Sequence, residues 1–348
     1  MSFSQSLTIV SCILCLALPV ASLAPGAIEG NVSSTGGSVL YVGGSGPGNY
    51  TKIQDALDNA SPGDTVYVYA GTYQEHVTVH TQVHFIGQNR STTIIDGELT
   101  DTVVSIRADG TTMSGFTVKN GRHYIMSAGI MVMANYTSIN NCEVCYNYNG
   151  IFLDCYTTRN FHNVVSNNWI HHNFDSIIVG GNSYCEVSNN TIMFTEATAI
   201  FASGDFVFPC HHNLIADNIL ERNSDGIDFT GDTYQMLVTR NIILDTIYNG
   251  MWLNCSDSMF SWNSIRDSGD YAVWCDFCSN NTYLHNDFIN AGYKLMWLEC
   301  HKTRDTLRGN YWDRHRLLPK PVPINFYNRI FYTVLFDWHP AWKPNVAI

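Results

Sequence analysis

A short apolar segment recurs between Gly129 and Leu298 of this chain, at intervals of 21 to 27 residues. A column of asparagines recurs at intervals of 22 to 28 residues. Periods of this size are typical of solenoids, in which each repeat buries its apolar face only against its neighbours. The apolar segments begin at Gly129, Gly150, Ser176, Ala199, Gly226, Gly250, Ala272 and Leu295. The asparagine column contains Asn168, Asn190, Asn218, Asn241, Asn263, Asn286 and Asn310.

The spacing within each repeat limits the kind of solenoid. Asn, Asp, Gly and Ser turns separate short β segments and leave no room for a ten-residue helix. The Leu-x-x-Leu-x-Leu signature of leucine-rich repeats is absent, and a propeller blade needs about 40 residues. We therefore predict an all-β fold, a single right-handed parallel β-helix with rungs of 22 to 27 residues. We expect the asparagines to hydrogen-bond along the stack at a bend.

The ends of the chain differ from the repeats. Residues 1–24 predict a signal peptide because Leu7 to Ala24 is uncharged and largely apolar, although no basic residue precedes Lys52. An uncleaved membrane anchor is the alternative. A Gly/Ser-rich linker follows over 25–37, the β-helix over 38–312, and a Pro- and aromatic-rich C-terminal cap over 313–348. We expect an extracellular or cell-surface protein with no further membrane span.

The first rungs include a short amphipathic helix. Thr51 and Gln54 have the spacing of a capping box, which predicts that the Thr51 side chain begins this helix. The helix is expected to cover the open end of the stack, which would otherwise be an exposed sheet edge. Strands are expected near 39–42, 65–69, 76–79 and 83–86, with a turn over Ala70–Tyr73.

Motifs at both ends carry a family resemblance. Tyr50-Thr-Lys-Ile-Gln-Asp-Ala-Leu and Gly63-Asp-Thr-Val-Tyr-Val resemble the opening rungs of carbohydrate-acting β-helix proteins. Gly309-Asn-Tyr-Trp and Asp337-Trp-His-Pro resemble the closing motifs of NosD-like right-handed β-helix proteins, which are abundant on the surfaces of methanogenic archaea. The resemblance implies a β-helix surface or sheath protein, but it is weak evidence for function because such folds host many activities.

An outward column of aromatic residues is the first candidate site. Within each apolar segment the second and fourth residues are apolar and must face inward, so the third faces outward. Such a column is longer than the apolar patches that monomers usually expose. A covering loop of the same chain, an interface between molecules and a sugar-stacking platform all remain open. The aromatic members of the column are Phe152, Phe201, Trp252, Trp274 and Trp297.

Acidic residues supply the case for an enzyme. Glycosidases need two carboxylates roughly 5 to 9.5 Å apart, and Asp225, Asp228, Asp276 and Glu299 lie on neighbouring repeats. The Asn-Thr-Asp, Asp-Asp and Gly-His-Gly motifs of polygalacturonase-like enzymes are absent. Solvated turn carboxylates are therefore preferred, and we assign no catalytic residue. If the chain is an enzyme, these four are the candidates.

Cysteine and histidine residues are candidates for crosslinks or metal ligands. Nine cysteines follow the predicted signal peptide, an odd number for an oxidised exported chain. The disulfide candidates are Cys155, Cys255, Cys278 and Cys300, within or between molecules. Cys142-x-x-Cys145 and Cys275-x-x-Cys278 have zinc-like spacing, but residues three apart on a strand face opposite sides. His171-His172 and His211-His212 lie two rungs apart. We predict no metal and no cofactor.

Composition narrows the functional classes. The net charge of −12 argues against nucleic-acid binding, which needs a basic surface. Low charge content, the aromatic column and the odd cysteine count favour a structural subunit of a surface layer or sheath. Its partners would be further copies of itself, with cell-surface glycans as a second option. The alternative is a secreted polysaccharide lyase or glycoside hydrolase, or a carbohydrate-binding β-helix without catalysis.

Overall fold

A computed structural model describes residues 37–153, 160–299, 304–313, 320–325, 333–337 and 340–346. These residues belong to one compact unit, Gly36–Ile348. The predicted signal peptide and almost all of the predicted linker lie outside the described residues. Within the described part of the chain, no helix is both long enough and apolar enough to cross a membrane.

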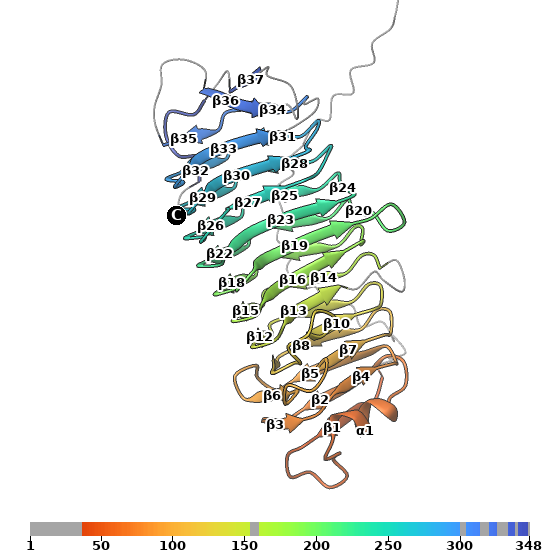
Figure 1. Cartoon of the computed structure of the whole chain (residues 1–348). Helices are drawn as coiled ribbons and strands as arrows, with labels where there is room; N and C mark the ends of the chain where they lie inside the picture. Colours follow the sequence, from red (N-terminus) through yellow and green to blue (C-terminus); the bar gives the residue numbers. More distant parts are fainter. Residues whose placement is uncertain are drawn as a thin grey trace, which may run out of the picture. The chain divides into compact units, whose positions relative to one another are not determined.

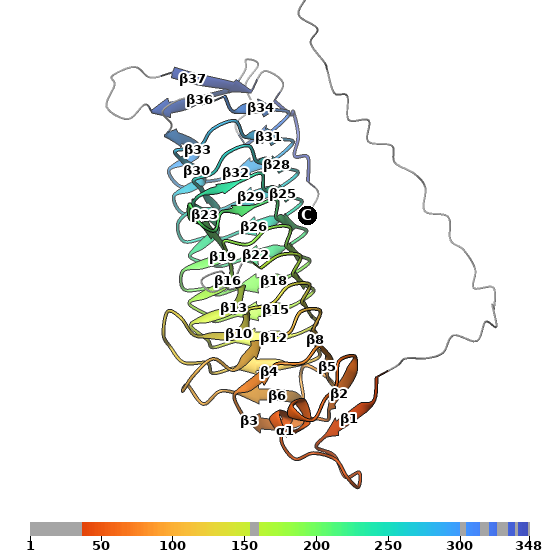
Figure 2. The same cartoon turned by 90° about the vertical axis from the view of Figure 1, so that its right-hand side faces the viewer.

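The described residues form a stack of rungs in which three parallel sheets run side by side (Figures 1 and 2). Each full rung contributes one strand to sheet A, then one to sheet B and one to sheet C. The predicted parallel β-helix is confirmed. Sheet A contains β1 (Val39–Val42), β2 (Asp64–Val68), β5 (Val83–Gly87), β8 (Thr112–Ser114), β11 (Ser138–Asn140), β14 (Val164–Ser166), β17 (Glu186–Ser188), β21 (Leu214–Ala216), β25 (Leu237–Thr239), β28 (Met259–Ser261), β31 (Thr282–Leu284) and β34 (Thr306–Arg308).

The other two sheets repeat the same order along the stack. Sheet B contains β3 (Gly71–Gln74), β6 (Thr93–Asp96), β9 (Thr117–Lys119), β12 (Glu143–Cys145), β15 (Trp169–His171), β18 (Thr191–Met193), β22 (Ile219–Glu221), β26 (Ile242–Leu244), β29 (Ser264–Arg266), β32 (Asp287–Ile289) and β35 (Tyr311–Trp312). Sheet C contains β4 (Val77–Val79), β7 (Val104–Ile106), β10 (Ala128–Val132), β13 (Asn149–Leu153), β16 (Asp175–Gly180), β19 (Thr198–Gly204), β23 (Asp225–Gly231), β27 (Met251–Leu253), β30 (Tyr271–Asp276), β33 (Lys294–Glu299), β36 (Lys320–Asn325) and β37 (Thr333–Asp337). A small extra pair joins β20 (Cys210–His211) to β24 (Thr233–Tyr234).

The interior of the stack is apolar, as the alternation of the repeats predicts. In sheet C, Ile130, Ile151, Ile177, Ile200 and Ile227 lie in register on successive rungs and are fully buried. Burial of a side chain of this size contributes roughly 1.5 to 3 kcal/mol. Because each rung repeats this contact with the next, the apolar column holds the rungs in a single register.

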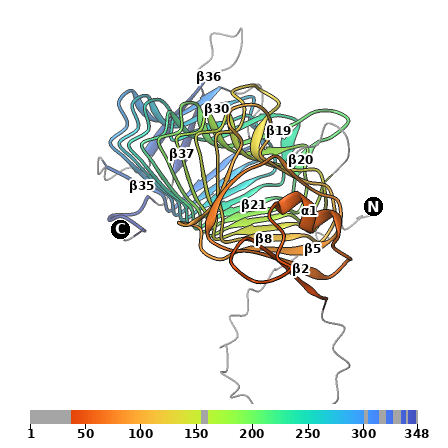
Figure 3. The same ribbon diagram turned by 90° about the horizontal axis from the view of Figure 1, so that it is seen from below.

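The N-terminal end is covered by helix α1 (Ile53–Asp58), which packs against β1, β2 and β4 (Figure 3). The predicted capping box is wrong, because the cap residue is Lys52 and no side chain in this position caps the helix. Instead, Glu75 of the next rung accepts hydrogen bonds from the backbone N–H groups of Ile53 (2.9 Å) and Gln54 (3.1 Å). The turn expected over Ala70–Tyr73 is also wrong, since β3 begins at Gly71.

The corner between sheets A and B carries the predicted asparagine ladder. A residue with positive φ precedes the ladder residue on successive rungs, as Asn189, Asp217 and Arg240 illustrate. The next residue is a buried asparagine whose Oδ1 accepts a hydrogen bond from the backbone N–H of the asparagine one rung earlier, as in the 3.0 Å bond from Asn218 to Asn241. These bonds stabilise a bend that is sterically costly for residues other than glycine.

The ladder ends on a carboxylate. Asp337, which is fully buried, accepts hydrogen bonds from the backbone N–H of Asn310 (3.0 Å) and from its side-chain amide (3.1 Å). It also accepts bonds from the backbone N–H of Gly309 (3.2 Å) and from Trp312 Nε1 (3.4 Å). Asp337 is the last residue of β37, which pairs antiparallel with β36 at the end of sheet C. The carboxylate thus connects the end of sheet C to the A–B corner.

Candidate functional site on the outer face of sheet C

The predicted outward column lies on sheet C, and its members are in register on successive rungs. Phe201 is followed by Asp228, Trp252, Trp274 and Trp297. The rings of Trp252 and Trp274 are stacked, with centroids 5.3 Å apart and planes 7° from parallel. Tyr271 lies beside Trp274, with ring centroids 5.4 Å apart. The column therefore places one carboxyl group between Phe201 and the three tryptophans.

Not all of the column is open to solvent. Phe152 is only 4% exposed and forms a small apolar cluster with Ala128 and Met131, separate from the interior core. Phe152 thus faces away from the interior, as the alternation predicts, but it is covered by the chain itself, and its role in binding or assembly stays a prediction. Phe201, Trp252, Trp274 and Trp297 are half-buried. The accessible part of the column thus begins near Phe201.

Asp228 is the most unusual group of this face. It is only 8% exposed, and its Oδ1 atom has no hydrogen-bond partner among the described residues. Burial raises the pKa of Asp228 from its usual value of 3.8 to about 7, and the negative charges of Asp225 and Asp175 add to this effect. The interpretation preferred from the sequence, a carboxylate solvated at a turn, is therefore wrong for Asp228. Close to neutral pH this carboxyl group can both hold and release a proton.

A second column beside the first supplies the neighbouring carboxylates. Asp175, Thr198, Asp225 and Asn249 lie on successive rungs. Asp225 Oδ1 accepts hydrogen bonds from the backbone N–H (2.8 Å) and the side-chain amide (3.0 Å) of Asn249. Burial raises the pKa of Asp225, and the bonds from Asn249 oppose that rise. Burial likewise raises the pKa of Asp175.

Three unpartnered polar atoms lie on neighbouring rungs of this part of the stack. Among the described residues, ten buried side-chain nitrogen or oxygen atoms have no hydrogen-bond partner, and Asp228 Oδ1, Asn249 Oδ1 and Trp274 Nε1 are three of them. They belong to three consecutive rungs of the stack. A buried polar atom without a partner costs roughly 1 to 3 kcal/mol, so each of these atoms is expected to bind water or a ligand. Together with the raised pKa of Asp228, these atoms make the part of sheet C between β23 and β30 the candidate site.

The remaining acidic candidates lie farther along sheet C. Asp276 on β30 is in register with Glu299 on β33, so the predicted placement on adjacent rungs is confirmed. Asp276 is half-buried. Nothing is described of the Glu299 side chain. Asp228 and Asp276 are separated by β27 and lie at different positions of the strand, so these two described candidates are not on adjacent rungs.

Of the four disulfide candidates, the structure describes only Cys255 and Cys278, and these two are not bonded to each other. Cys255 and Cys278 are free thiols that are 3% and 2% exposed. Cys155 and Cys300 lie outside the described residues. Burial raises the pKa of Cys142 to about 11 and that of Cys185 to about 12, which keeps these sulfurs in the unreactive thiol form. A disulfide between molecules through Cys255 or Cys278 would require the sulfur to leave the core.

Two residues of this site were missed from the sequence, Asp175 and Asn249. The alignment of repeats could have found both, because each precedes an apolar segment by one residue, as Asp225 does. The signal lies in the column and not in any local motif.

Comparisons with known proteins agree with this architecture. A model of the family described as "Right handed beta helix region" matches residues 171–311. A model described as "Periplasmic copper-binding protein (NosD)" matches residues 57–206. No significant match to a curated protein sequence was found.

Several solved structures have a similar fold. The A-module of the Azotobacter vinelandii mannuronan C-5 epimerase AlgE6 is 16% identical with a TM-score of 0.62, over 74% of this chain and 81% of that one. The DFA-IIIase of Arthrobacter chlorophenolicus A6 is 13% identical with a TM-score of 0.57, over 78% and 82%. The alginate lyase of a Paenibacillus species is 15% identical with a TM-score of 0.51, over 84% and 95%. At these identities the similarity is one of fold alone.

Proposed function

We propose that this chain, a NosD-like right-handed β-helix repeat protein, binds a polysaccharide along the outer face of sheet C and hydrolyses its glycosidic bonds. The observation that carries the proposal is the environment of Asp228. This buried carboxyl group has a pKa raised to about 7 and an unpartnered oxygen. It also lies one rung from a stacked pair of tryptophans.

The chemistry of glycoside hydrolysis fits these groups. One carboxyl group must stay protonated to donate to the leaving oxygen, while a second, ionised one acts as base or nucleophile. Asp228 suits the first role because its raised pKa keeps it protonated up to about neutral pH. Asp225 suits the second role, since the two hydrogen bonds from Asn249 favour its charged form. Trp252 and Trp274 would stack against sugar rings.

The charge of the site favours an uncharged glycan. Asp175, Asp225 and Asp228 form an acidic group, and the ion pairs of the described residues lie elsewhere on the molecule. A uronate polymer would bring its own carboxylates towards this group and be repelled. A lyase acting on uronates also needs positive charge near the substrate carboxylate. We therefore propose a neutral polysaccharide as the substrate.

The names of similar proteins support a carbohydrate and an export route. Two of the similar structures are called mannuronan epimerase and alginate lyase, and one matching family is described as periplasmic. We accordingly place the chain in an extracellular or periplasmic compartment. Free thiols are compatible with such a compartment here, because the seven described cysteines are all buried.

The test is a substrate panel with matched variants. The full chain is incubated with neutral polysaccharides such as β-glucan, xylan and fructan, and with alginate and pectate, and the release of reducing ends is measured. We expect release from a neutral polysaccharide, with no ultraviolet-absorbing unsaturated product. Asp228→Asn should lower kcat roughly 10²- to 10⁴-fold, as expected for loss of a general acid.

Two further variants separate catalysis from binding and from charge. Trp252→Ala should raise KM more than it lowers kcat, because a stacking surface contributes to binding. Asp232→Asn removes an exposed carboxylate that follows β23 directly and should leave activity unchanged. Full activity in Asp228→Asn, or an unsaturated product from a uronate, would refute the proposed mechanism.

A structural role in a surface layer or sheath is the second candidate. Large exposed side chains favour it, among them Phe206 at 95%, Trp342 at 69% and Tyr293 at 68% exposure. Such side chains are enriched at contacts between proteins. Assembly would be seen by electron microscopy and by sedimentation at high protein concentration under oxidising conditions. A chain that stays monomeric under these conditions is not a self-assembling subunit.

A further inference from the structure

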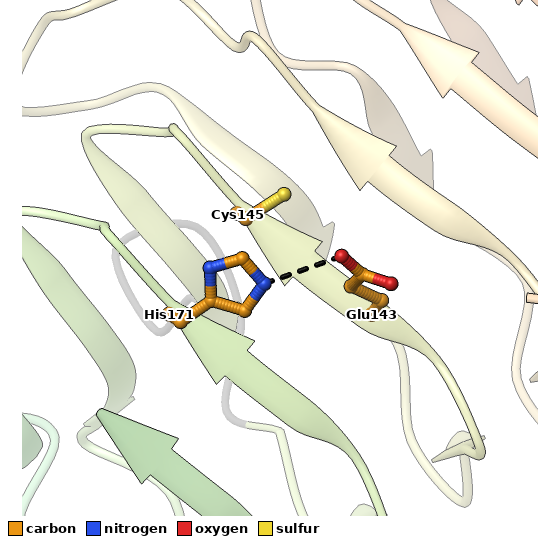
Figure 4. A group of neighbouring side chains, drawn as sticks. All are labelled: Glu143, Cys145 and His171. Carbon is orange, nitrogen blue, oxygen red and sulfur yellow. Dashed lines mark hydrogen bonds and ion pairs between the residues drawn. The ribbon is translucent and has the colours of Figure 1, made fainter. Parts of the chain in front are cut away.

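A second group of reactive side chains lies on the outer face of sheet B, away from the proposed glycan site. Glu143 and Cys145 are two residues apart on β12, so their side chains face the same side. His171 on the next rung is in register with Cys145. One donor atom from each residue lies within 4.8 Å of the other two, and His171 Nε2 is 3.2 Å from Glu143 Oε1 (Figure 4). The stacking of rungs thus brings a thiol, an imidazole and a carboxylate together.

We propose that Glu143, Cys145 and His171 form a zinc site with one coordination position left for water or a ligand. Zn²⁺ accepts sulfur, nitrogen and oxygen donors together, and three protein ligands with an open fourth position are typical of its reactive sites. The carboxylate argues against Cu⁺, which selects soft thiolate and thioether donors. The metal-free alternative is a hydrogen bond from His171 to Glu143 beside a buried thiol.

Charge around the three residues suits a divalent cation. Lys119, which is in register with Cys145 on the preceding rung, forms an ion pair with Asp96 at 3.4 Å. The charges of Lys119 and Asp96 cancel each other, so Lys119 does not offset the negative charge of Glu143. Burial raises the pKa of Cys145 to about 12, so this thiol would lose its proton only as the cation binds. Glu143 and the resulting thiolate would then supply two negative charges, which match the charge of Zn²⁺.

The surroundings of His171 also fit a metal ligand. Its Nδ1 atom is 2.8 Å from Nδ1 of His172, which can accept a hydrogen bond from it. This would leave the Nε2 lone pair directed towards Glu143. Metal-binding histidines usually donate their second ring N–H to such a partner, which fixes the tautomer. The ring centroids of Trp169 and His171 are 4.3 Å apart, and the His171 side chain is only 8% exposed.

No sequence motif indicates this site, because only the two Cys-x-x-Cys pairs have zinc-like spacing. Cys142 belongs to the interior core, whereas Cys145 lies on the outer face beside Glu143. The partners of Cys145 are therefore a glutamate on its own strand and a histidine one rung later. The second histidine pair, His211 and His212, has the same 2.8 Å contact between Nδ1 atoms and serves as a matched control.

The test uses the full chain after removal of metal with a chelator. Zn²⁺ affinity is measured by competition with a chromophoric chelator, and Co²⁺ is used as a spectroscopic probe. We expect one ion per chain and a thiolate-to-cobalt charge-transfer band. This band should disappear in Cys145→Ser and persist in Cys142→Ser. Circular dichroism shows whether each variant is folded.

The affinities distinguish ligands from their supporting residues. His172→Gln should weaken Zn²⁺ binding about 10- to 100-fold, as loss of an outer partner does, and His171→Gln and Glu143→Gln should weaken it further. His212→Gln should leave the affinity unchanged. Stoichiometric Zn²⁺ binding that survives in folded Cys145→Ser and His171→Gln overturns the site, as does absence of binding by the native chain. Preference for Cu⁺ over Zn²⁺ would overturn the choice of metal.

Discussion

At the scale of single residues, Asp228 is held in a protonation state that its sequence position does not reveal. The alternation of the repeat shows correctly that Asp228 faces outward. Its neighbours in register on the adjoining rungs are Phe201 and Trp252, and its pKa depends also on Asp175 two rungs earlier. Contacts between rungs therefore determine the chemistry of the residue, and a single repeat contains none of them.

The raised pKa of Asp228 predicts a pH-dependent effect on stability. The native chain holds this proton up to pH about 7, whereas the unfolded chain releases it near pH 4. Unfolding therefore releases a proton in this window, and native stability falls as pH rises through it. Asp228→Asn removes this loss and should raise the free energy of unfolding at pH 8 by on the order of 4 kcal/mol.

The measurement is denaturant unfolding of the native chain and Asp228→Asn between pH 4 and pH 8. The difference between them should be small at pH 4, where the carboxyl group is protonated in the native chain and about half protonated in the unfolded chain. Asp232→Asn, which changes an exposed carboxylate, should show no such difference. An Asp228→Asn variant that is equally stable at pH 8 would show that this carboxyl group is ionised without cost in the native chain.

At the scale of one element, helix α1 shows how a long-range contact can replace a local motif. Its existence and its apolar face were predictable, and Ile53, Ala56 and Leu57 are buried. The capping partner was not, because Glu75 lies on the following rung, 22 residues from Ile53. A sequence motif reports only residues that are near in the chain, whereas a solenoid brings residues one period apart into contact.

The two possible caps of α1 make opposite predictions. Glu75→Ala leaves the backbone N–H groups of Ile53 and Gln54 without their partner and should destabilise the chain by about 1 kcal/mol. Thr51→Ala should have little effect, because Thr51 is exposed and does not cap the helix. Thermal unfolding of the two variants decides the matter. A larger loss of stability in Thr51→Ala than in Glu75→Ala would show that the Thr51 side chain caps the helix after all.

At the scale of the whole molecule, the asparagine ladder connects most of the stack into one hydrogen-bonded column. The side-chain amide of each member donates to Oδ1 of the next, from Asn168 through Asn310. The last amide donates to Asp337. The period of the asparagines predicts the ladder. The sequence places Asp337 in a closing motif but does not show that this carboxylate ends the ladder. Its partners, Gly309 and Asn310, lie in another sheet corner.

The end of the ladder is expected to contribute to the stability of the last rungs. In Asp337→Asn an amide N–H₂ replaces one acceptor oxygen, so at least one buried N–H of Gly309 or Asn310 loses its partner. This should cost roughly 1 to 3 kcal/mol. Amide hydrogen exchange should show faster opening near Asn310 and little change near Asn168, because repeats interact mainly with their neighbours. Equal acceleration at both positions would show that the stack unfolds as one unit.

The ladder also has a consequence for how such chains change over evolutionary time. Each internal asparagine accepts from the rung before it and donates to the rung after it, so the internal rungs are chemically interchangeable. The end that α1 covers and the end that Asp337 closes are not interchangeable with the internal rungs. Duplication or loss of one internal repeat would leave both ends intact and change only the length of the outer face. Related chains could therefore differ in the length of the partner that binds to the outer face, while the end covered by α1 and the end closed by Asp337 stay the same.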